Sequence, residues 1–187
     1  MKQGPRVMAG TFSGFIVTGV ETGIRPTSER VRKSFFDIMR HRLPEMHMID
    51  AFAGSGIMGF EALSRGAGSV VFIEQSKSAC RRLKRQVSEL QCGERARVIC
   101  GDAGVHLAEA ISLANHWIVF CDPPYRLRIM PEILKRIGEP MLKPRLDQVI
   151  IEHHHKLDPV GDTHFWMVHR REKYGETVLT FLQPVAG

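Results

Sequence analysis

The sequence predicts an α/β protein in which a mostly parallel, doubly wound sheet of seven strands is covered by helices. Two patterns indicate this class. From about residue 46 onward, short apolar runs alternate with helical stretches, as in repeated strand–helix units. After residue 163 two strand-like runs follow one another, which predicts a C-terminal antiparallel hairpin that closes the sheet. A length of 187 residues suits one domain of ordinary size.

The elements follow in order from these patterns. The apolar runs predict parallel strands at 46–51, 69–74, 96–100, 117–121 and 148–152. The stretches between them predict helices at about 57–66, 76–91, 104–114 and 128–142. The hairpin is expected to pair 164–169 with 177–182, with residues 170–176 as the connection.

Residues 1–45 predict a small basic extension in front of this domain, which spans 46–187. Segments 6–9 and 15–20 could pair as a β-hairpin, and Thr27 is a plausible N-cap for a helix that runs to about residue 42. The chain has a net charge of +6, and residues 1–42 carry eight basic and three acidic side chains. Positive charge concentrated in this way is typical of a surface that binds phosphates, so we expect the extension to dock RNA.

The composition places the chain among soluble proteins. It is 43% apolar and 25% charged, and no apolar run approaches the roughly 20 residues that cross a bilayer. No signal-peptide pattern follows the first residues, so the expected location is the cytoplasm, without a membrane partner. The four cysteines have no CxxC spacing, and we interpret them as free, buried thiols.

The tetrapeptide Asp122-Pro123-Pro124-Tyr125 at the end of an apolar strand predicts a site for an exocyclic amine. Such an amine is a poor nucleophile because its lone pair is delocalised into the base ring. Asp122 supplies a carboxylate acceptor, and the two prolines fix the backbone so that the Pro123 carbonyl can face the same amine. Tyr125 supplies a flat face on which a flipped base could stack. A strand followed by a Pro-Pro turn with a core tyrosine is the structural alternative.

A glycine-rich loop after the first predicted core strand indicates a nucleotide-type cofactor in a Rossmann-like fold. Gly54-Ser55-Gly56-Ile57-Met58-Gly59 lies between a strand and a helix, the context in which a GxGxxG match is informative. Glu74, twenty residues after Gly54, is positioned to accept from ribose hydroxyls. Both a nicotinamide and an adenosyl cofactor fit these features.

Acidic residues at the strand ends favour the adenosyl cofactor. Asp50 can face the cationic methionyl part of S-adenosylmethionine, whereas a carboxylate there would repel a pyrophosphate. Asp102 could accept from the adenine amine with Ala103 against the ring, and Asp102 could equally cap the next helix. Because ligands of doubly wound sheets lie at the carboxyl ends of the strands, Asp50, Glu74, Asp102 and Asp122 are expected to converge on one crevice.

These motifs resemble a known family. Residues 50–56 together with Asp122-Pro123-Pro124-Tyr125 are similar to class I S-adenosylmethionine-dependent amino-methyltransferases. Segments 25–27, 30–32, 61–67 and 174–177 further resemble the RsmD-type 16S ribosomal RNA guanine-N2-methyltransferases, over nearly the whole chain. Two positions depart from the expected pattern. Phe15 stands where relatives usually place Arg, and Gln86 stands where many have Asn.

The resemblance implies transfer of a methyl group from S-adenosylmethionine, leaving S-adenosylhomocysteine, to the N2 amine of one guanine of 16S rRNA in the 30S subunit or an assembly intermediate. We expect a monomer that acts without a metal. The implied cofactor residues are Asp50, Phe52, Ala53, Gly54, Ser55, Gly56, Gly59, Glu74, Gln75, Asp102 and Ala103. The implied catalytic residues are Asp122, Pro123, Pro124 and Tyr125, and the candidate RNA contacts are Arg25, Thr27, Arg30, Arg32 and Lys33.

Three other functions stay open at the level of sequence. The amine motif is shared with methyltransferases that act on adenine or cytosine in DNA, a noncatalytic RNA-binding assembly factor could retain the fold, and a nicotinamide oxidoreductase fits the glycine loop. His153-His154-His155 invites a metal site, but adjacent residues of a strand point to opposite faces and cannot share one ion without distortion.

Overall fold

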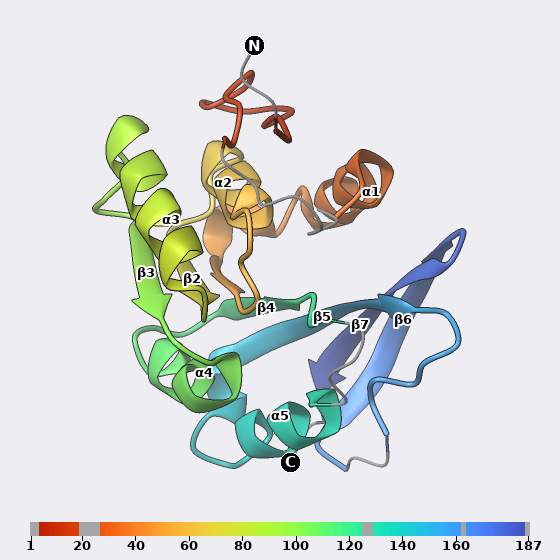
Figure 1. Ribbon diagram of the computed structural model, residues 1–187. Helices are drawn as coiled ribbons and strands as arrows, with labels where there is room; N and C mark the ends of the chain where they lie inside the picture. The colour runs from red at the N-terminus through yellow and green to blue at the C-terminus, as the bar shows by residue number, and fades with distance from the viewer. Residues whose placement is uncertain (1–3, 19–26, 125–128, 162–163, 186–187) are drawn as a thin grey trace.

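The structure is a computed structural model that describes residues 4–18, 27–124, 129–161 and 164–185. Within these residues a seven-stranded sheet has the order β3-β2-β1-β4-β5-β7-β6 (Figure 1). The first five strands are parallel, and β7 is antiparallel to both β5 and β6. The strands are β1 (His47–Asp50), β2 (Val70–Glu74), β3 (Ala96–Cys100), β4 (Trp117–Cys121), β5 (Leu146–His154), β6 (Trp166–Tyr174) and β7 (Thr177–Pro184). The helices are α1 (Glu29–Met39), α2 (Ile57–Ser64), α3 (Lys77–Glu89), α4 (Ala103–Ile111) and α5 (Met130–Ile137).

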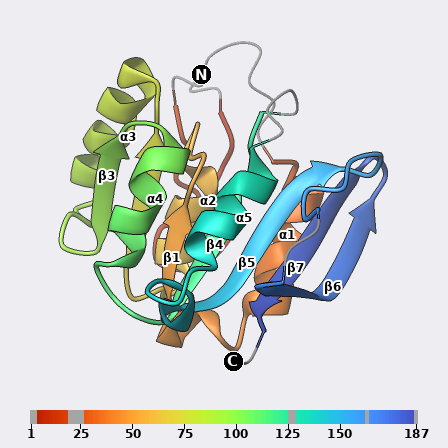
Figure 2. The same cartoon turned by 90° about the horizontal axis from the view of Figure 1, so that it is seen from below.

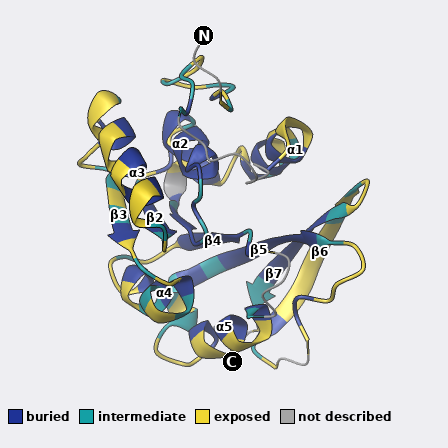
Figure 3. Ribbon diagram, viewed as in Figure 1, coloured by how far each residue is buried: buried dark blue, intermediate teal, exposed yellow. Residues whose placement is uncertain are grey.

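Helices cover both faces of the parallel part of the sheet. Figures 1 and 2 show α1, α2 and α3 on one face and α4 and α5 on the other. Strand β4 serves both faces, because Ile118 and Phe120 pack into the core under α1–α3 while Trp117, Val119 and Cys121 pack into the core under α4 and α5. The strand is therefore apolar at every position, and it is buried throughout in Figure 3.

The α/β class, the seven strands and the parallel core are confirmed. Strands β3 and β4 have the predicted bounds, and β5 is longer at both ends than the predicted 148–152. The last helix is shorter than expected, because α5 ends at Ile137 where Gly138 and then Pro140 break the helical pattern. No helix in the described ranges is long and apolar enough to cross a membrane.

The N-terminal segment is attached to α2. Arg6 and Ile16 form an antiparallel bridge, and the Val7 N–H donates to the Phe15 carbonyl at 2.9 Å. The N–H groups of Met8 and Ala9 donate to the buried carboxylate of Glu61 at 2.7 and 3.2 Å. The pairing expected for 15–20 can be described only to residue 18.

Helix α1 begins one residue later than predicted. Ser28, not Thr27, is the N-cap, and its Oγ accepts from the Val31 N–H at 3.3 Å. Thr27 lies outside the helix and is buried, with 8% of its surface exposed. The two hydroxyl residues are adjacent and both are good caps, so the sequence alone could not separate them.

The connection between the two strands of the C-terminal hairpin is shorter than predicted. Residues 170–174 belong to β6, and Gly175-Glu176 alone form the turn, with Gly175 at a φ of +63°. Strand β6 is the edge of the sheet and most of its side chains are exposed (Figure 3). An edge strand tolerates charged residues such as Arg170 and Lys173. A search for apolar runs therefore does not detect the second half of β6.

The cysteine prediction is wrong for one pair. Cys80 in α3 and Cys100 at the end of β3 form a disulfide, with their Cα atoms 5.9 Å apart. Cys92 and Cys121 are free and buried, as expected. The pairing was missed because it depends on α3 packing beside β3, a contact between residues 20 positions apart that no spacing motif marks.

Candidate functional site

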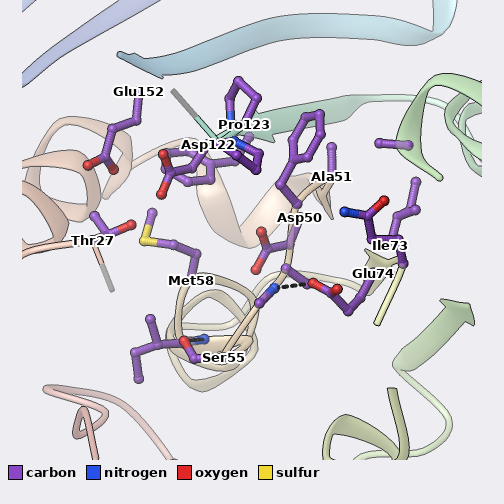
Figure 4. A pocket seen from close by; sticks show the side chains of 18 of the residues that line it. Thr27, Asp50, Ala51, Ser55, Met58, Ile73, Glu74, Asp122, Pro123 and Glu152 are labelled. Atoms are coloured by element: carbon purple, nitrogen blue, oxygen red, sulfur yellow. Dashed lines mark hydrogen bonds between the residues drawn. The ribbon is translucent and has the colours of Figure 1, made fainter. Parts of the chain in front are cut away.

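A cavity of about 600 Å³ opens at the carboxyl ends of the parallel strands (Figure 4). It lies where β1 and β4 are neighbours although the chain leaves them toward opposite edges of the sheet, the usual ligand position in a doubly wound fold. Residues from β1, β2, β4 and β5 line it, together with the start of α1, of α2 and of α4. The predicted convergence of Asp50, Glu74, Asp102 and Asp122 is borne out, since all four line this cavity.

Asp50 is the most buried acidic group of the predicted cofactor region. It ends β1 with 3% of its surface exposed, and its Oδ2 accepts from the Gly59 N–H at 3.2 Å. Burial raises the pKa of Asp50 to about 7; the Gly59 hydrogen bond opposes this rise and the negative charge of Glu74 adds to it. A cation in the cavity would therefore be attracted to the ionised carboxylate.

The glycine loop divides into residues that face the cavity and residues that shape it. Gly54 and Ser55 line the cavity, whereas Gly56 and Gly59 do not. Gly56 has a φ of +80°, and a Cβ on Gly59 would lie 2.2 Å from Cε1 of Phe72. Arg82 donates to the Gly54 carbonyl at 2.8 Å, so the loop is held from α3. Gly56 and Gly59 thus allow the close packing that places Gly54 and Ser55.

Two acidic residues from β2 and β3 line the other part of the cavity. Glu74 accepts from the N–H groups of Gly54 and Ser76, each at 2.7 Å, which orients its carboxylate. Asp102 stands at the N-cap position of α4, but its side chain makes no capping hydrogen bond. Its carboxylate is exposed, and Ala103 beside it is buried. Phe52, Ala53 and Gln75 complete the predicted set along this lining.

The Asp122-Pro123-Pro124 segment follows β4 and lines the same cavity. The pKa of Asp122 is raised well above its ordinary value. Burial removes water from the carboxyl group, and the negative charges of Glu152 and Asp50 repel its ionised form. Tyr125, the fourth residue of the motif, lies outside the described residues. Asp122 and Pro123 of the motif therefore line one cavity with Asp50 and Gly54.

Several lining residues were not predicted. Glu152, Ser28 and Thr177 contribute to the cavity from β5, the start of α1 and the start of β7. Glu152 could have been found, because it follows the same rule as Asp50 and Glu74, an acidic residue near the carboxyl end of a parallel strand. Thr177 could not, because only the antiparallel return of β7 beside β5 brings it there.

The candidate RNA contacts separate into different environments. Arg30 and Lys33 are exposed on α1, and the Arg30 guanidinium lies 5.9 Å from the centre of the Tyr174 ring. Arg32 is 3% exposed and donates to the Arg6 carbonyl at 3.0 Å, so it holds the N-terminal segment and is not available to a phosphate. Its assignment as an RNA contact is wrong, because helical spacing places it on the opposite side from Arg30 and Lys33. Arg25 lies outside the described residues.

The two residues that depart from the family pattern, Phe15 and Gln86, both pack against other parts of the protein. Phe15 packs its ring against Phe60 at 6.2 Å between centroids. Gln86 is 2% exposed within α3. Among the described residues no group of three or more His, Cys, Asp or Glu side chains could hold a metal, and His153 Nε2 instead contacts the Thr180 hydroxyl at 2.8 Å.

Comparison with known proteins assigns the chain to a family. A family model described as conserved hypothetical protein 95 matches residues 5–183. The chain belongs to this family. One curated relative is the ribosomal RNA small subunit methyltransferase D of Haemophilus influenzae, 33% identical over 136 residues that cover 72% of this chain and 70% of the relative. The protein of the same name from Escherichia coli is 33% identical over 135 residues, covering 72% and 67%.

A comparison with solved structures supports the same assignment. An Escherichia coli protein provisionally assigned as a methyltransferase superposes with a TM-score of 0.79 at 27% identity, over 98% of this chain and 99% of that chain. The family member described here is thus a methyltransferase with the Rossmann-like fold of its relatives, which removes the nicotinamide oxidoreductase from the candidate functions.

Proposed function

We propose that this methyltransferase transfers the methyl group of S-adenosylmethionine to the exocyclic N2 amine of a guanine in 16S rRNA, within an assembled or assembling 30S subunit. The observation that carries the proposal is the placement of Asp122 and Pro123 in one cavity with Asp50 and Gly54. A site for an amine and a site for a cationic cofactor thereby adjoin. The names of the curated relatives support an RNA of the small ribosomal subunit as substrate.

The residues of the cavity fit S-adenosylmethionine, which supplies a methyl group already activated on a sulfonium. The buried Asp50 has a raised pKa, and an adjacent positive charge would stabilise its ionised form. Glu74 is oriented to accept from ribose hydroxyls because two N–H groups already hold its carboxylate. The uncapped carboxylate of Asp102 would accept from the adenine amine, with Ala103 against the ring.

Asp122 and the Pro123 carbonyl would accept hydrogen bonds from the target amine. Two acceptors on a single nitrogen favour a pyramidal geometry, in which its lone pair is free to attack. Positioning of this kind supplies most of the acceleration when the donor is already activated. Tyr125 would stack on the flipped base, and Asp122 or a water would take the proton that leaves the amine.

The N-terminal extension, residues 1–45, would dock the RNA in front of the catalytic domain, residues 46–187. Arg30 and Lys33 are exposed on α1, and Thr27 and Ser28, which precede this helix, line the cavity. Phosphates bound by this helix would therefore lie close to the opening through which a base enters. Arg25 stays in this proposal, and Arg32 does not.

The test incubates the purified protein with methyl-labelled S-adenosylmethionine and, in parallel, unmodified 30S subunits, naked 16S rRNA and unmethylated DNA. Nucleoside mass spectrometry then identifies the labelled base. N2-methylguanosine in the 30S subunit or the rRNA is the expected product. Label in DNA would replace the proposal with a DNA amino-methyltransferase, and cofactor binding without any label would favour a noncatalytic assembly factor.

A further inference from the structure

Glu152 lies beside the proposed amine site. In the sheet, Cys121 at the end of β4 pairs with Ile151 of β5, so Asp122 directly after β4 and Glu152 within β5 follow a paired position on neighbouring parallel strands. Glu152 is 5% exposed and lines the cavity. Figure 4 shows its carboxylate next to Asp122, on the side of the cavity that Thr27 and Met58 occupy, while Glu74 lies on the far side of Asp50.

The pleat of the sheet directs both carboxylates to the same face. Cys121 and Ile151 pack into the core under α4 and α5. Because successive side chains of a strand alternate between faces, the residues that follow them turn toward α1 and α2. The side chain of Glu152 therefore faces the same space as that of Asp122, and its position is set by the strand and not by a loop.

A second carboxylate at this place distinguishes between the bases that carry an exocyclic amine. In guanine two ring nitrogens flank the amine: N3 accepts, whereas N1, on the Watson–Crick edge, carries a hydrogen and donates. In adenine the corresponding nitrogen, N1, accepts, and in cytosine N3 accepts. An ionised carboxylate only accepts, so it pairs with the guanine edge and repels the other two.

We propose that Glu152 determines the specificity for guanine, accepting from N1–H while Asp122 accepts from the N2 amine. This inference rests on the proposed transfer to guanine N2. The negative charge of Glu152 contributes to the raised pKa of Asp122, so the two carboxylates repel each other. Two donors from one guanine edge offset that repulsion, whereas the acceptor of adenine or cytosine would increase it.

The probe is small-subunit RNA in which 2-aminopurine replaces the guanine that becomes labelled, assembled as the wild-type reaction requires. 2-Aminopurine keeps the reacting amine, but its N1 accepts instead of donating. The wild-type protein is expected to methylate guanine with a kcat/KM at least about tenfold higher than that for 2-aminopurine. Equal rates on the two RNAs would overturn the inference, without any variant being needed.

The variant Glu152→Gln tests the residue itself. Its amide can donate to N1 of 2-aminopurine, so the ratio of kcat/KM for guanine over 2-aminopurine should fall by about tenfold or more. This ratio does not depend on the fraction of folded protein, so a purely structural role would leave it unchanged. Glu94→Gln makes the same chemical change at an exposed residue outside the cavity and should keep the wild-type ratio.

The outcomes separate this inference from the proposed function. If wild type labels no guanine N2, the proposed function fails and the inference fails with it. If wild type labels guanine N2 and the Glu152→Gln ratio equals the wild-type ratio, only the role of Glu152 is overturned. A reduced ratio in Glu152→Gln, with Glu94→Gln unchanged, supports both.

Discussion

Carboxylates of similar chemistry have different environments in the cavity because their immediate neighbours differ. Glu74 is held by two N–H donors, whereas Asp50 is held by one and is more deeply buried. Asp122 has acidic neighbours on both sides, Glu152 and Asp50. A carboxylate that N–H donors already fix suits a neutral ligand such as ribose. A carboxylate that is buried away from water suits a cation or an amine, because that ligand restores the lost hydrogen bonds.

Replacing Asp122 with alanine should separate chemistry from cofactor binding. Asp122→Ala removes an acceptor from the amine but leaves the region of Asp50, Gly54 and Glu74 intact. We expect kcat to fall by roughly 10²- to 10³-fold, the size of effect seen when one preorganised polar contact is lost. Calorimetric affinity for S-adenosylmethionine should stay within about twofold of wild type, since that effect belongs to the transition state. A variant with wild-type turnover would contradict the assignment.

The raised pKa of Asp50 predicts a pH-dependent cofactor affinity. With a pKa of about 7, the carboxyl is mostly protonated one unit below this value and mostly ionised one unit above it. Only the ionised form attracts a cation, so the affinity for S-adenosylmethionine should rise from about pH 6 to about pH 8. Titration calorimetry across this range measures it. Asp50→Asn cannot ionise, and a wild-type profile that parallels the profile of this variant would show that Asp50 does not cause the rise.

At the scale of elements, the position of the glycine loop depends on how closely α2 approaches β2. Gly59 in α2 lies against Phe72 of β2, and the Gly59 N–H also binds Asp50. The helix therefore packs on the sheet and also holds the carboxylate of Asp50. Phe60 continues the contact, with its ring 5.0 Å from that of Phe72 between centroids.

Gly59→Ala should destabilise the fold by overpacking this contact. The added Cβ would lie 2.2 Å from Cε1 of the fully buried Phe72, so helix or ring must shift. We expect a loss of about 1–3 kcal/mol in the free energy of unfolding, measured with urea. Gly93→Ala is the control, because nothing lies within 4 Å of its Cβ, and it should change stability by less than about 0.5 kcal/mol. Equal effects of the two changes would refute this packing role.

At the scale of the whole molecule, the positive charge and the cavity are arranged around α1. Thr27 and Ser28, which precede its first turn, line the cavity, while Arg30 and Lys33 are exposed on the helix. A second group of exposed basic residues, Lys84 and Arg85, lies on α3 at the other side of this layer (Figure 1). The two groups have equal charge. They differ in their surroundings, because α1 packs on β4, with the rings of Phe35 and Phe120 5.4 Å apart between centroids, whereas α3 contacts β2 and β3.

Neutralising the α1 group should weaken RNA binding more than neutralising the α3 group. The double variant Arg30→Gln and Lys33→Gln should reduce the slope of log affinity against log salt by roughly 1.5, because two phosphate contacts would be lost. Binding of 16S rRNA at several salt concentrations measures this slope. Lys84→Gln with Arg85→Gln removes the same charge and should leave the slope near wild type. An equal reduction of the slope in both variants would indicate that the RNA is attracted by the overall positive charge and does not dock on one face.

Much of the sheet was predictable because both faces of its central strands are buried. Strand β4 is apolar at all five positions, which marks its bounds in the sequence, and the glycine loop marks the end of β1. Strand β6 was predicted too short because its exposed edge imposes no such pattern. Thr27 was misassigned as the cap because Ser28 next to it satisfies the same local rule.

The sequence by itself determined the motifs, their order and the strand ends that carry Asp50, Glu74, Asp102 and Asp122, because local patterns of burial and turn formation are written in neighbouring residues. Only the tertiary structure decided that Glu152 adjoins Asp122, that Arg32 is buried and that Cys80 meets Cys100. These contacts join residues distant in the chain. They depend on strand register and helix packing, which follow from the balance of the whole core and not from any single segment.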